Sequence, residues 1–374
     1  MPRSEMPMGS TMAANQDTAL CQLIKSRIMA EGSIGLDDFM ALALSHPEHG
    51  YYMTRDHFGL KGDFITAPEI SQMFGELIGL WSLDQMQGQG IADQAGFFEL
   101  GPGRGTLMAD ILRAITPFSQ NRNWPLHMLE ISPALKDQQI ARLSPRAIHH
   151  HDEASPWPDI PLIFIANEFF DALPIRQWMR RQGQWCERRV TLEDDQLSLS
   201  LEPSDYNPSS HGESGDLKDD QIIEEAPALP ALVARISHHI QLFGGAALII
   251  DYGKANPVGD TLQAVRDHKP VDILDSPGEA DLSAWVDFNT IKHHAEEQGI
   301  QAIGPIGQGE FLKQLGLYQR AEQLSLHADP KTRRMIAAAV DRLSSPAQMG
   351  TLFQVMALLP ANANNEPPGF SNAS

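Results

Sequence analysis

The stretch FFELGPGRGTLMADILR, from Phe97 to Arg113, is typical of a strand, a glycine-rich turn and the start of a helix. Gly101, Gly103 and Gly105 give the spacing G-x-G-x-G, whereas the dinucleotide fingerprint would place its third glycine at Thr106. A P-loop is excluded because no Gly-Lys-Ser/Thr follows. The glycine spacing alone leaves open a tight turn with no ligand, so the residues around it must identify the site.

On both sides of this stretch, strand and helix patterns alternate, which is typical of a parallel α/β sheet. We expect strands at 97–100, 126–130, 146–150, 162–166 and 246–251, and a last, edge strand within 349–360. Helical patterns at 105–115, 132–143 and 227–243 lie between them. The sequence therefore predicts an α/β fold with a mostly parallel, Rossmann-like sheet.

Further segments lie outside this alternation. Two helices at 18–32 and 35–52 predict an N-terminal cap, and the capping-box pair Thr66 and Glu69 predicts a helix that runs on to Trp81. The expected division is a mobile tail (1–17), a helical cap (18–61), the first part of the core (62–171), a β-meander insert with a polar loop (172–225), the second part of the core with long substrate loops from 253 to about 310 (226–360), and a second mobile tail (361–374).

Composition limits the classes of partner. The 374 residues include 28 Lys and Arg against 48 Asp and Glu, a formal charge of −20 that disfavours binding to nucleic acid and to anionic membranes. No stretch approaches the roughly 20 apolar residues of a membrane helix. Cys21 and Cys186 lack the spacing of a zinc site or a disulfide framework. We expect a cytoplasmic protein without a signal peptide.

Carboxylates around the glycine turn indicate the ligand. Glu99 directly precedes the turn, where it would repel a pyrophosphate and attract an ammonium or sulfonium group. Glu130 ends the second strand, where it can accept both hydroxyl hydrogens of a ribose, and Asp152 and Glu153 follow the third strand, near an adenine amine. A ligand with these groups and no phosphate is S-adenosylmethionine. Ile131 and Pro102 complete this expected cofactor site with the three glycines.

The end of the fourth strand supplies the expected substrate side. Asn167, Glu168 and Asp171 follow a buried apolar run, at the sheet edge where α/β enzymes bind their ligands. Paired carboxylates suit an arginine guanidinium, so we expect Glu168 and Asp171, with Asn167, to be catalytic. Asn167 also belongs to the expected cofactor site. The alternative is that the carboxylates only cap the next turn and pair with Arg176 or Arg180.

No metal site is expected. The three histidines at 149, 150 and 151 alternate between the two faces of an extended strand, so they cannot converge on one ion.

Several long blocks in order resemble the MidA family of S-adenosylmethionine-dependent methyltransferases. These blocks, which extend the resemblance over about residues 20 to 360, are HPEHGYYMTRDHFGLKGDFITAPEISQMFGELIGLW, ELGPGRGTLMADILRA, LEISPALKDQQ, ANEFFDALPIRQW, LIIDYG, GDTLQAVRDH, GEADLSAWVDF and QGEFLKQLG. The resemblance implies a class I methyltransferase fold with an added domain. Mitochondrial members of the family dimethylate an arginine of a complex I subunit symmetrically and so act in complex I assembly.

The resemblance also extends the expected site. It implies that the segment with Asp63, Thr66, Pro68 and Glu69 folds over the methionine end of the cofactor, and that Asp251 and Tyr252 lie at the lip of the substrate cleft. The expected partner is a protein with a reactive arginine, such as a respiratory-chain subunit, and the chain is expected to form a homodimer. Methylation of a small molecule and a non-catalytic role as an assembly factor remain alternatives.

Overall fold

The central sheet has the strand order of the class I methyltransferase fold. The computed structural model describes residues 18–54, 66–120, 122–206, 219–363 and 366–371. The order is β15-β16-β10-β5-β2-β3-β4, with β14 beside β10. The five strands from β10 to β4 are parallel and β16 is antiparallel to both of its neighbours. The strands are β2 (Gly96–Leu100), β3 (Leu126–Leu129), β4 (Ile148–His151), β5 (Leu162–Asn167), β10 (Gly245–Lys254), β14 (Val286–Asp287), β15 (Ile300–Gly307) and β16 (Phe353–Pro360).

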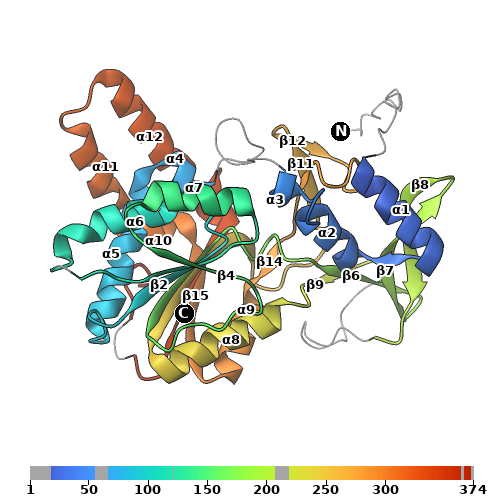
Figure 1. Ribbon diagram of the computed structural model, residues 1–374, viewed down its shortest axis with the longest axis horizontal. Helices are drawn as coiled ribbons and strands as arrows, with labels where there is room; N and C mark the ends of the chain where they lie inside the picture. The colour runs from blue at the N-terminus through green and yellow to red at the C-terminus, as the bar shows by residue number, and fades with distance from the viewer. Residues whose placement is uncertain (1–17, 55–65, 121, 207–218, 364–365, 372–374) are drawn as a thin grey trace, which may run out of the picture.

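Helices cover both faces of this sheet because successive strand residues point to opposite sides. Phe97 packs into one core with α5, α6, α10 and α12, whereas Phe98 packs into a second core with α8 and α9. Figure 1 shows these two layers in the left half of the molecule. The helices are α5 (Gln72–Gly88), α6 (Thr106–Ile115), α7 (Pro133–Leu143), α8 (Leu229–Phe243), α9 (Phe288–Glu297), α10 (Gln308–Gln314), α11 (Leu317–Ser325), α12 (Pro330–Ser344) and α13 (Met349–Leu352), with a short 3-10 turn at Thr116–Phe118.

A second module lies beside the central sheet, at the right of Figure 1. Most of its members share a third hydrophobic core, and β6 and β9 join them by strand pairing, although the members come from three distant parts of the chain. We call it the lateral module. It consists of α1 (Ala19–Glu31), β1 (Ile34–Gly35), α2 (Leu36–Ser45), α3 (Tyr51–Thr54), β6 (Arg176–Arg181), β7 (Gln184–Glu193), β8 (Gln196–Pro203), β9 (Ile222–Glu225), β11 (Gln263–Arg266), β12 (Lys269–Val271) and β13 (Asp281–Ser283).

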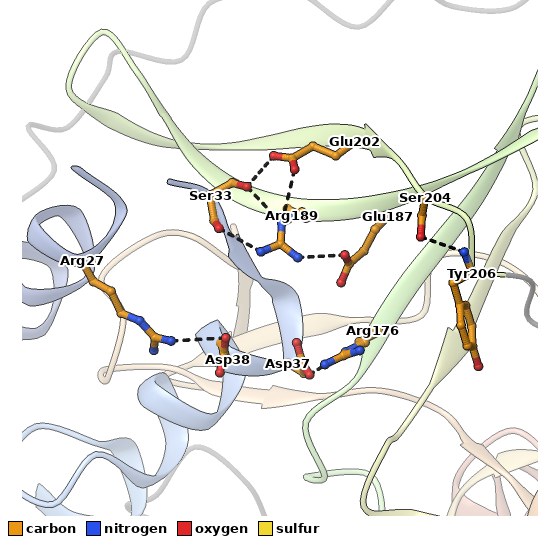
Figure 2. Close-up of polar contacts among 10 residues, drawn as sticks. All are labelled: Arg27, Ser33, Asp37, Asp38, Arg176, Glu187, Arg189, Glu202, Ser204 and Tyr206. Atoms are coloured by element: carbon orange, nitrogen blue, oxygen red, sulfur yellow. Dashed lines mark hydrogen bonds and ion pairs between the residues drawn. The ribbon is translucent and has the colours of Figure 1, made fainter. Parts of the chain in front are cut away.

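Polar contacts join the N-terminal cap to the inserted sheet (Figure 2). β1 pairs antiparallel with β7. Arg189 on β7 donates to the Ser33 carbonyl at 2.8 Å and to Glu187 at 2.8 Å, and Ser33 also donates to Glu202 on β8. Arg176 donates to Asp37 on α2 at 2.7 Å. The cap and the insert, expected as separate segments, therefore fold as one unit.

The structure corrects several expectations from the sequence. β16 is not an edge strand, since β15 lies outside it, and β15 arises from the region expected to be long loops, together with α9 and β11 to β14. The helix expected from Thr66 breaks into α4 (Ala67–Ile70) and α5, because Ser71 has an extended backbone and its hydroxyl caps α5 by accepting from Met73 N. Thr66 makes no side-chain capping bond.

The C-terminal segment differs from the expected tail. Residues 1–17 lie outside the described residues. In the C-terminal segment Phe370 is fully buried and packs on Phe311 with their rings 5.3 Å apart, so the tail expected over 361–374 contains a residue that belongs to the core. Across the described ranges, no helix has the length and apolar character needed to span a bilayer.

Candidate active site

A cavity of about 700 Å³ lies where the parallel strands end and the lateral module begins. The core contributes the turn after β2, the ends of β3 and β5, and part of α6, while α3, β11 and β13 line the opposite side. Seven carboxylates line the cavity, from Glu69, Glu99, Glu130, Glu153, Glu168, Asp171 and Asp281. Among the described residues its arginines are Arg104 and Arg342. This excess of negative charge favours a cationic ligand.

The glycine turn is shaped for close approach. Gly101 has a φ of +63°, and a Cβ there would lie 2.8 Å from the Phe169 ring, so a larger residue would displace the aromatic side chain. Pro102 and Gly103 line the cavity with Gly101. Gly105 is the N-cap of α6 in the left-handed region, and it packs behind the turn, near Gln139, instead of lining the cavity.

Glu99 is the buried carboxylate of the site. Its side chain lines the cavity but is only 2% exposed, and its Oε2 has no hydrogen-bond partner among the described residues. Burial, assisted by the charge of Glu130, raises the pKa of Glu99 to about 8. A bound cation would replace the lost solvation and favour the ionised form. The orphaned oxygen therefore fits a cofactor that carries positive charge.

Glu130 is oriented by neighbouring donors. Its Oε1 accepts from Ser132 N at 2.9 Å, and its Oε2 accepts from Gln139 Nε2 at 3.1 Å. Gln139 also donates to the Gly103 carbonyl at 2.7 Å, and its own oxygen lies 2.7 Å from His150 Nε2. Burial raises the pKa of Glu130, and these hydrogen bonds oppose the rise. Gln139 thus links the carboxylate to the glycine turn.

Of the two carboxylates expected near the adenine, Glu153 lines the cavity and Asp152 does not. Ile131 and Glu153 line the cavity, and the Ile131 side chain is 41% exposed. Asp152 does not line it, because its Oδ1 accepts from Ala154 N at 3.1 Å and from Ser155 Oγ at 2.6 Å. Asp152 therefore stabilises the turn after β4, a local role that the sequence did not distinguish from ligand binding.

The segment around α4 bridges two sides of the cavity, and we call residues 66–70 the strap. Thr66, Pro68 and Glu69 line the cavity, whereas Asp63 lies outside the described residues. Glu69 accepts from Thr106 Oγ1 at 2.6 Å, which ties the strap to the start of α6. Glu69 is therefore not the reciprocal cap expected from the sequence.

The loop after β5 brings the expected substrate residues to the cavity. Asn167, Glu168 and Asp171 all line it. Glu168 has a left-handed backbone with φ of 53°, and its Oε1 accepts from Ala67 N at 3.0 Å and Asn167 Nδ2 at 3.2 Å. Burial raises the pKa of Glu168, and these two donors and the charge of Arg342 oppose the rise.

Asp251 stabilises this loop by two hydrogen bonds to its backbone. Expected at the lip of the cleft, it is instead fully buried, and its Oδ2 accepts from Phe169 N at 3.1 Å and Phe170 N at 2.8 Å.

Burial and then the charges of Asp251, Asp281 and Glu168 raise the pKa of Asp171 well above its usual value. Tyr252 lines the cavity as expected. The alternative in which Arg176 pairs with these carboxylates is not supported, since Arg176 binds Asp37.

Residues that the sequence did not single out complete the cavity. Tyr52 on α3 donates to Asp281 on β13 at 2.9 Å, and Arg342 on α12 acts on the Glu168 charge. Sequence spacing gives no signal for Tyr52 and Asp281, which are 229 residues apart. The blocks HPEHGYY and GEADLS, which belong to the family resemblance, contain both and could have pointed to them.

The buried acid predicts a pH dependence of stability. Because the folded-state pKa of Glu99 is raised from about 4.5 to about 8, the free energy of unfolding of the ligand-free protein should fall as pH rises from 5 to 8, by about 3.5 kcal/mol. Urea unfolding of wild type and Glu99→Gln at both pH values measures it. The variant should lose less stability over this interval, whereas Glu48→Gln at an exposed position should follow wild type. Equal losses in wild type and Glu99→Gln would contradict the assignment.

The histidines of β4 take part in contacts within the protein. His151 Nε2 lies 3.0 Å from His127 Nδ1, and His150 contacts Gln139. In the part of the chain that the structure describes, no three His, Cys, Asp or Glu side chains form a group that could hold a metal ion.

Comparison with known proteins identifies the family. Residues 77–306 match the family described as "Putative S-adenosyl-L-methionine-dependent methyltransferase". A Drosophila melanogaster homologue of the mitochondrial protein arginine methyltransferase NDUFAF7 is 36% identical over 96% of this chain and 89% of its own length. The human NDUFAF7 protein is 34% identical over 94% of this chain and 86% of its own length. Because these relatives are mitochondrial, they do not support the cytoplasmic location expected from the sequence.

A solved structure supports the fold. A Burkholderia thailandensis protein bound to S-adenosyl-homocysteine superimposes with a TM-score of 0.84 at 24% identity, over 99% of this chain and 98% of that one. The family match, the class I strand order and a cavity that fits a cationic nucleotide-like ligand agree. The chain belongs to this family of S-adenosyl-L-methionine-dependent methyltransferases.

Proposed function

We propose that this methyltransferase methylates an arginine side chain of a protein. The observation that carries the proposal is the group of carboxylates after β5 and on β13, where Glu168, Asp171 and Asp281 face one cavity. A guanidinium is a cation whose planar donors suit paired carboxylates. The names of the relatives, which are protein arginine methyltransferases, support the same substrate class.

The cofactor end of the cavity is assigned by its donors and acceptors. In the proposed arrangement Glu99 faces the positive methionine end, Glu130 accepts from the ribose hydroxyls, and Ile131 and Glu153 surround the adenine. Asn167 and the strap residues Thr66, Pro68 and Glu69 close over the methionine end. S-adenosylmethionine, when bound, supplies an electrophilic methyl group on a sulfonium.

The chain's own residues would orient the acceptor and receive a proton. Glu168 is fixed by Ala67 N and Asn167 Nδ2, so its carboxylate is held in place before a substrate binds. A guanidinium nitrogen loses one proton when it is methylated. Burial raises the pKa values of Glu168 and Asp171, which makes either carboxylate a better proton acceptor than an exposed one.

Labelled methyl transfer tests this function. The protein is incubated with S-adenosylmethionine labelled in its methyl group and with a lysate from a strain that lacks the protein, and the products are analysed by mass spectrometry. We expect label on arginine of a protein, as symmetric dimethylarginine. A reaction without the enzyme is the control.

Other outcomes would identify the alternatives. A labelled metabolite with no labelled protein would overturn the arginine assignment in favour of a small-molecule substrate. Lack of cofactor binding by calorimetry would favour the assembly factor. The respiratory-chain subunit as substrate, complex I assembly as the process, and the homodimer stay predictions that the labelled protein and its partners would test.

A further inference from the structure

The lateral module places a phenol and a carboxylate next to the β5 loop, whose Asp171 carbonyl accepts from Ala284 N at 2.9 Å. Tyr52 and Asp281 both line the cavity, and the Tyr52 hydroxyl donates to Asp281 Oδ1 at 2.9 Å. Ser283, two residues further along β13, lines it as well. Asp281 pairs in register with Val265 of β11, another lining residue, so this wall is a continuous part of the small sheet.

Tyr52 and Asp281 interact electrostatically with Asp171 of the β5 loop. Asp171 lies close enough to Asp281 for their charges to interact, and it also interacts with Tyr52. Burial, followed by the charges of Asp281 and Asp171, raises the pKa of Tyr52 well above its usual value, so the phenol stays protonated and remains a donor. Glu168 and Asp171 of the β5 loop and Asp281 of β13 therefore line one cavity, with Asp171 next to β13.

From this geometry we propose that Asp281, held by Tyr52, is a third guanidinium ligand of the substrate site, beside Asp171 and together with Glu168. The inference rests on the proposed arginine substrate. A guanidinium presents donors along more than one edge, so carboxylates from the β5 loop and from β13 can bind it together. The Tyr52 hydroxyl fixes the Asp281 rotamer.

Tyr52 is a positioning residue in this arrangement, and its place depends on the lateral module. α3 follows α2, and α2 is tied to β6 by the Asp37 to Arg176 contact (Figure 2). Tyr51 is buried beside Tyr52, with their rings 5.3 Å apart in an edge arrangement. The packing of the lateral module thus sets where the phenol meets Asp281.

Binding of a small arginine probe tests the proposal without turnover. The protein saturated with S-adenosyl-homocysteine is titrated by calorimetry with N-acetyl-L-arginine amide, and with the neutral citrulline analogue. Asp281→Asn should weaken arginine amide binding by roughly 10- to 100-fold, the range of a charge-assisted hydrogen bond, and Tyr52→Phe should weaken it by about 5- to 10-fold. The affinity for S-adenosyl-homocysteine should stay within about two-fold of wild type in both variants, as expected for residues outside the cofactor contacts.

Tyr206→Phe is the matched control. Tyr206 follows β8 and donates to Glu225 of β9, but it does not line the cavity, so its variant should bind arginine amide like wild type. Tyr52→Phe keeps the ring, and thermal unfolding verifies that each variant is folded.

The outcomes separate this inference from the proposed function. Unchanged arginine amide affinity in Asp281→Asn and Tyr52→Phe, with a wild type that prefers arginine amide to the citrulline analogue, would overturn the role of this pair alone. A wild type without that preference would overturn the proposed arginine site and the pair together.

Discussion

Replacing Glu168 by Gln should lower kcat by about 1,000-fold while the affinity for S-adenosyl-homocysteine changes by less than about three-fold. Glutamine keeps the side-chain length and an oxygen that can accept from Ala67 N, so the strap should stay in place. It removes the negative charge that would orient a guanidinium and accept its proton. Loss of turnover with intact cofactor binding is thus the expected signature.

Single-turnover methyl transfer and calorimetry on the same preparations measure both quantities. Glu48→Gln is the matched control, because Glu48 is an exposed carboxylate outside the cavity. If Glu168→Gln kept more than about a tenth of the wild-type kcat, the carboxylate would only cap the left-handed turn that it occupies.

Glu130→Ala should weaken the binding of S-adenosyl-homocysteine by about 100-fold or more, since two hydrogen bonds to a charged acceptor contribute roughly 1.5–3 kcal/mol each. The variant also leaves Ser132 N and Gln139 Nε2 without their acceptor. Glu130→Gln keeps one acceptor oxygen and should lose only about ten-fold. Isothermal titration with S-adenosyl-homocysteine measures both changes.

The order of the two variants gives this prediction its specificity. If the carboxylate binds hydroxyl groups of the ligand, Glu130→Ala should bind S-adenosyl-homocysteine more weakly than Glu130→Gln, and Glu130→Gln should bind it more weakly than wild type. Equal affinities in all three proteins would show that Glu130 serves the packing of Gln139 and the glycine turn instead.

Much of the cofactor half of the site could be predicted from the sequence because its residues lie at the ends of strands. Glu99 and Glu130 occupy the ends of β2 and β3, and parallel strands bring their carboxyl ends to one edge of a sheet. Asp152 shows the limit of that rule. A short acidic side chain after a strand can accept from its own turn, and its position alone does not distinguish the two roles.

The substrate half of the site depends on long-range contacts that sequence patterns do not reveal. β11 and β13 are only four and three residues long, and they lie in a region rich in glycine, proline and aspartate that is typical of loops. The break at Ser71 arises because its own hydroxyl caps α5, a local contact that competes with the continuous apolar pattern. Long-range pairs such as Tyr52 with Asp281 follow only from the assembled fold.

The arrangement of the cavity in the chain bears on how this enzyme could change its substrate. Its cofactor side is drawn from residues between 66 and 153, together with Asn167, which could diverge little without loss of the cofactor. The facing wall is gathered from residues 51–52, 263–268 and 281–283, held together by the lateral module. Substitutions in that module can therefore reshape acceptor choice independently of methyl-donor chemistry, which makes it the natural target for redesigning specificity.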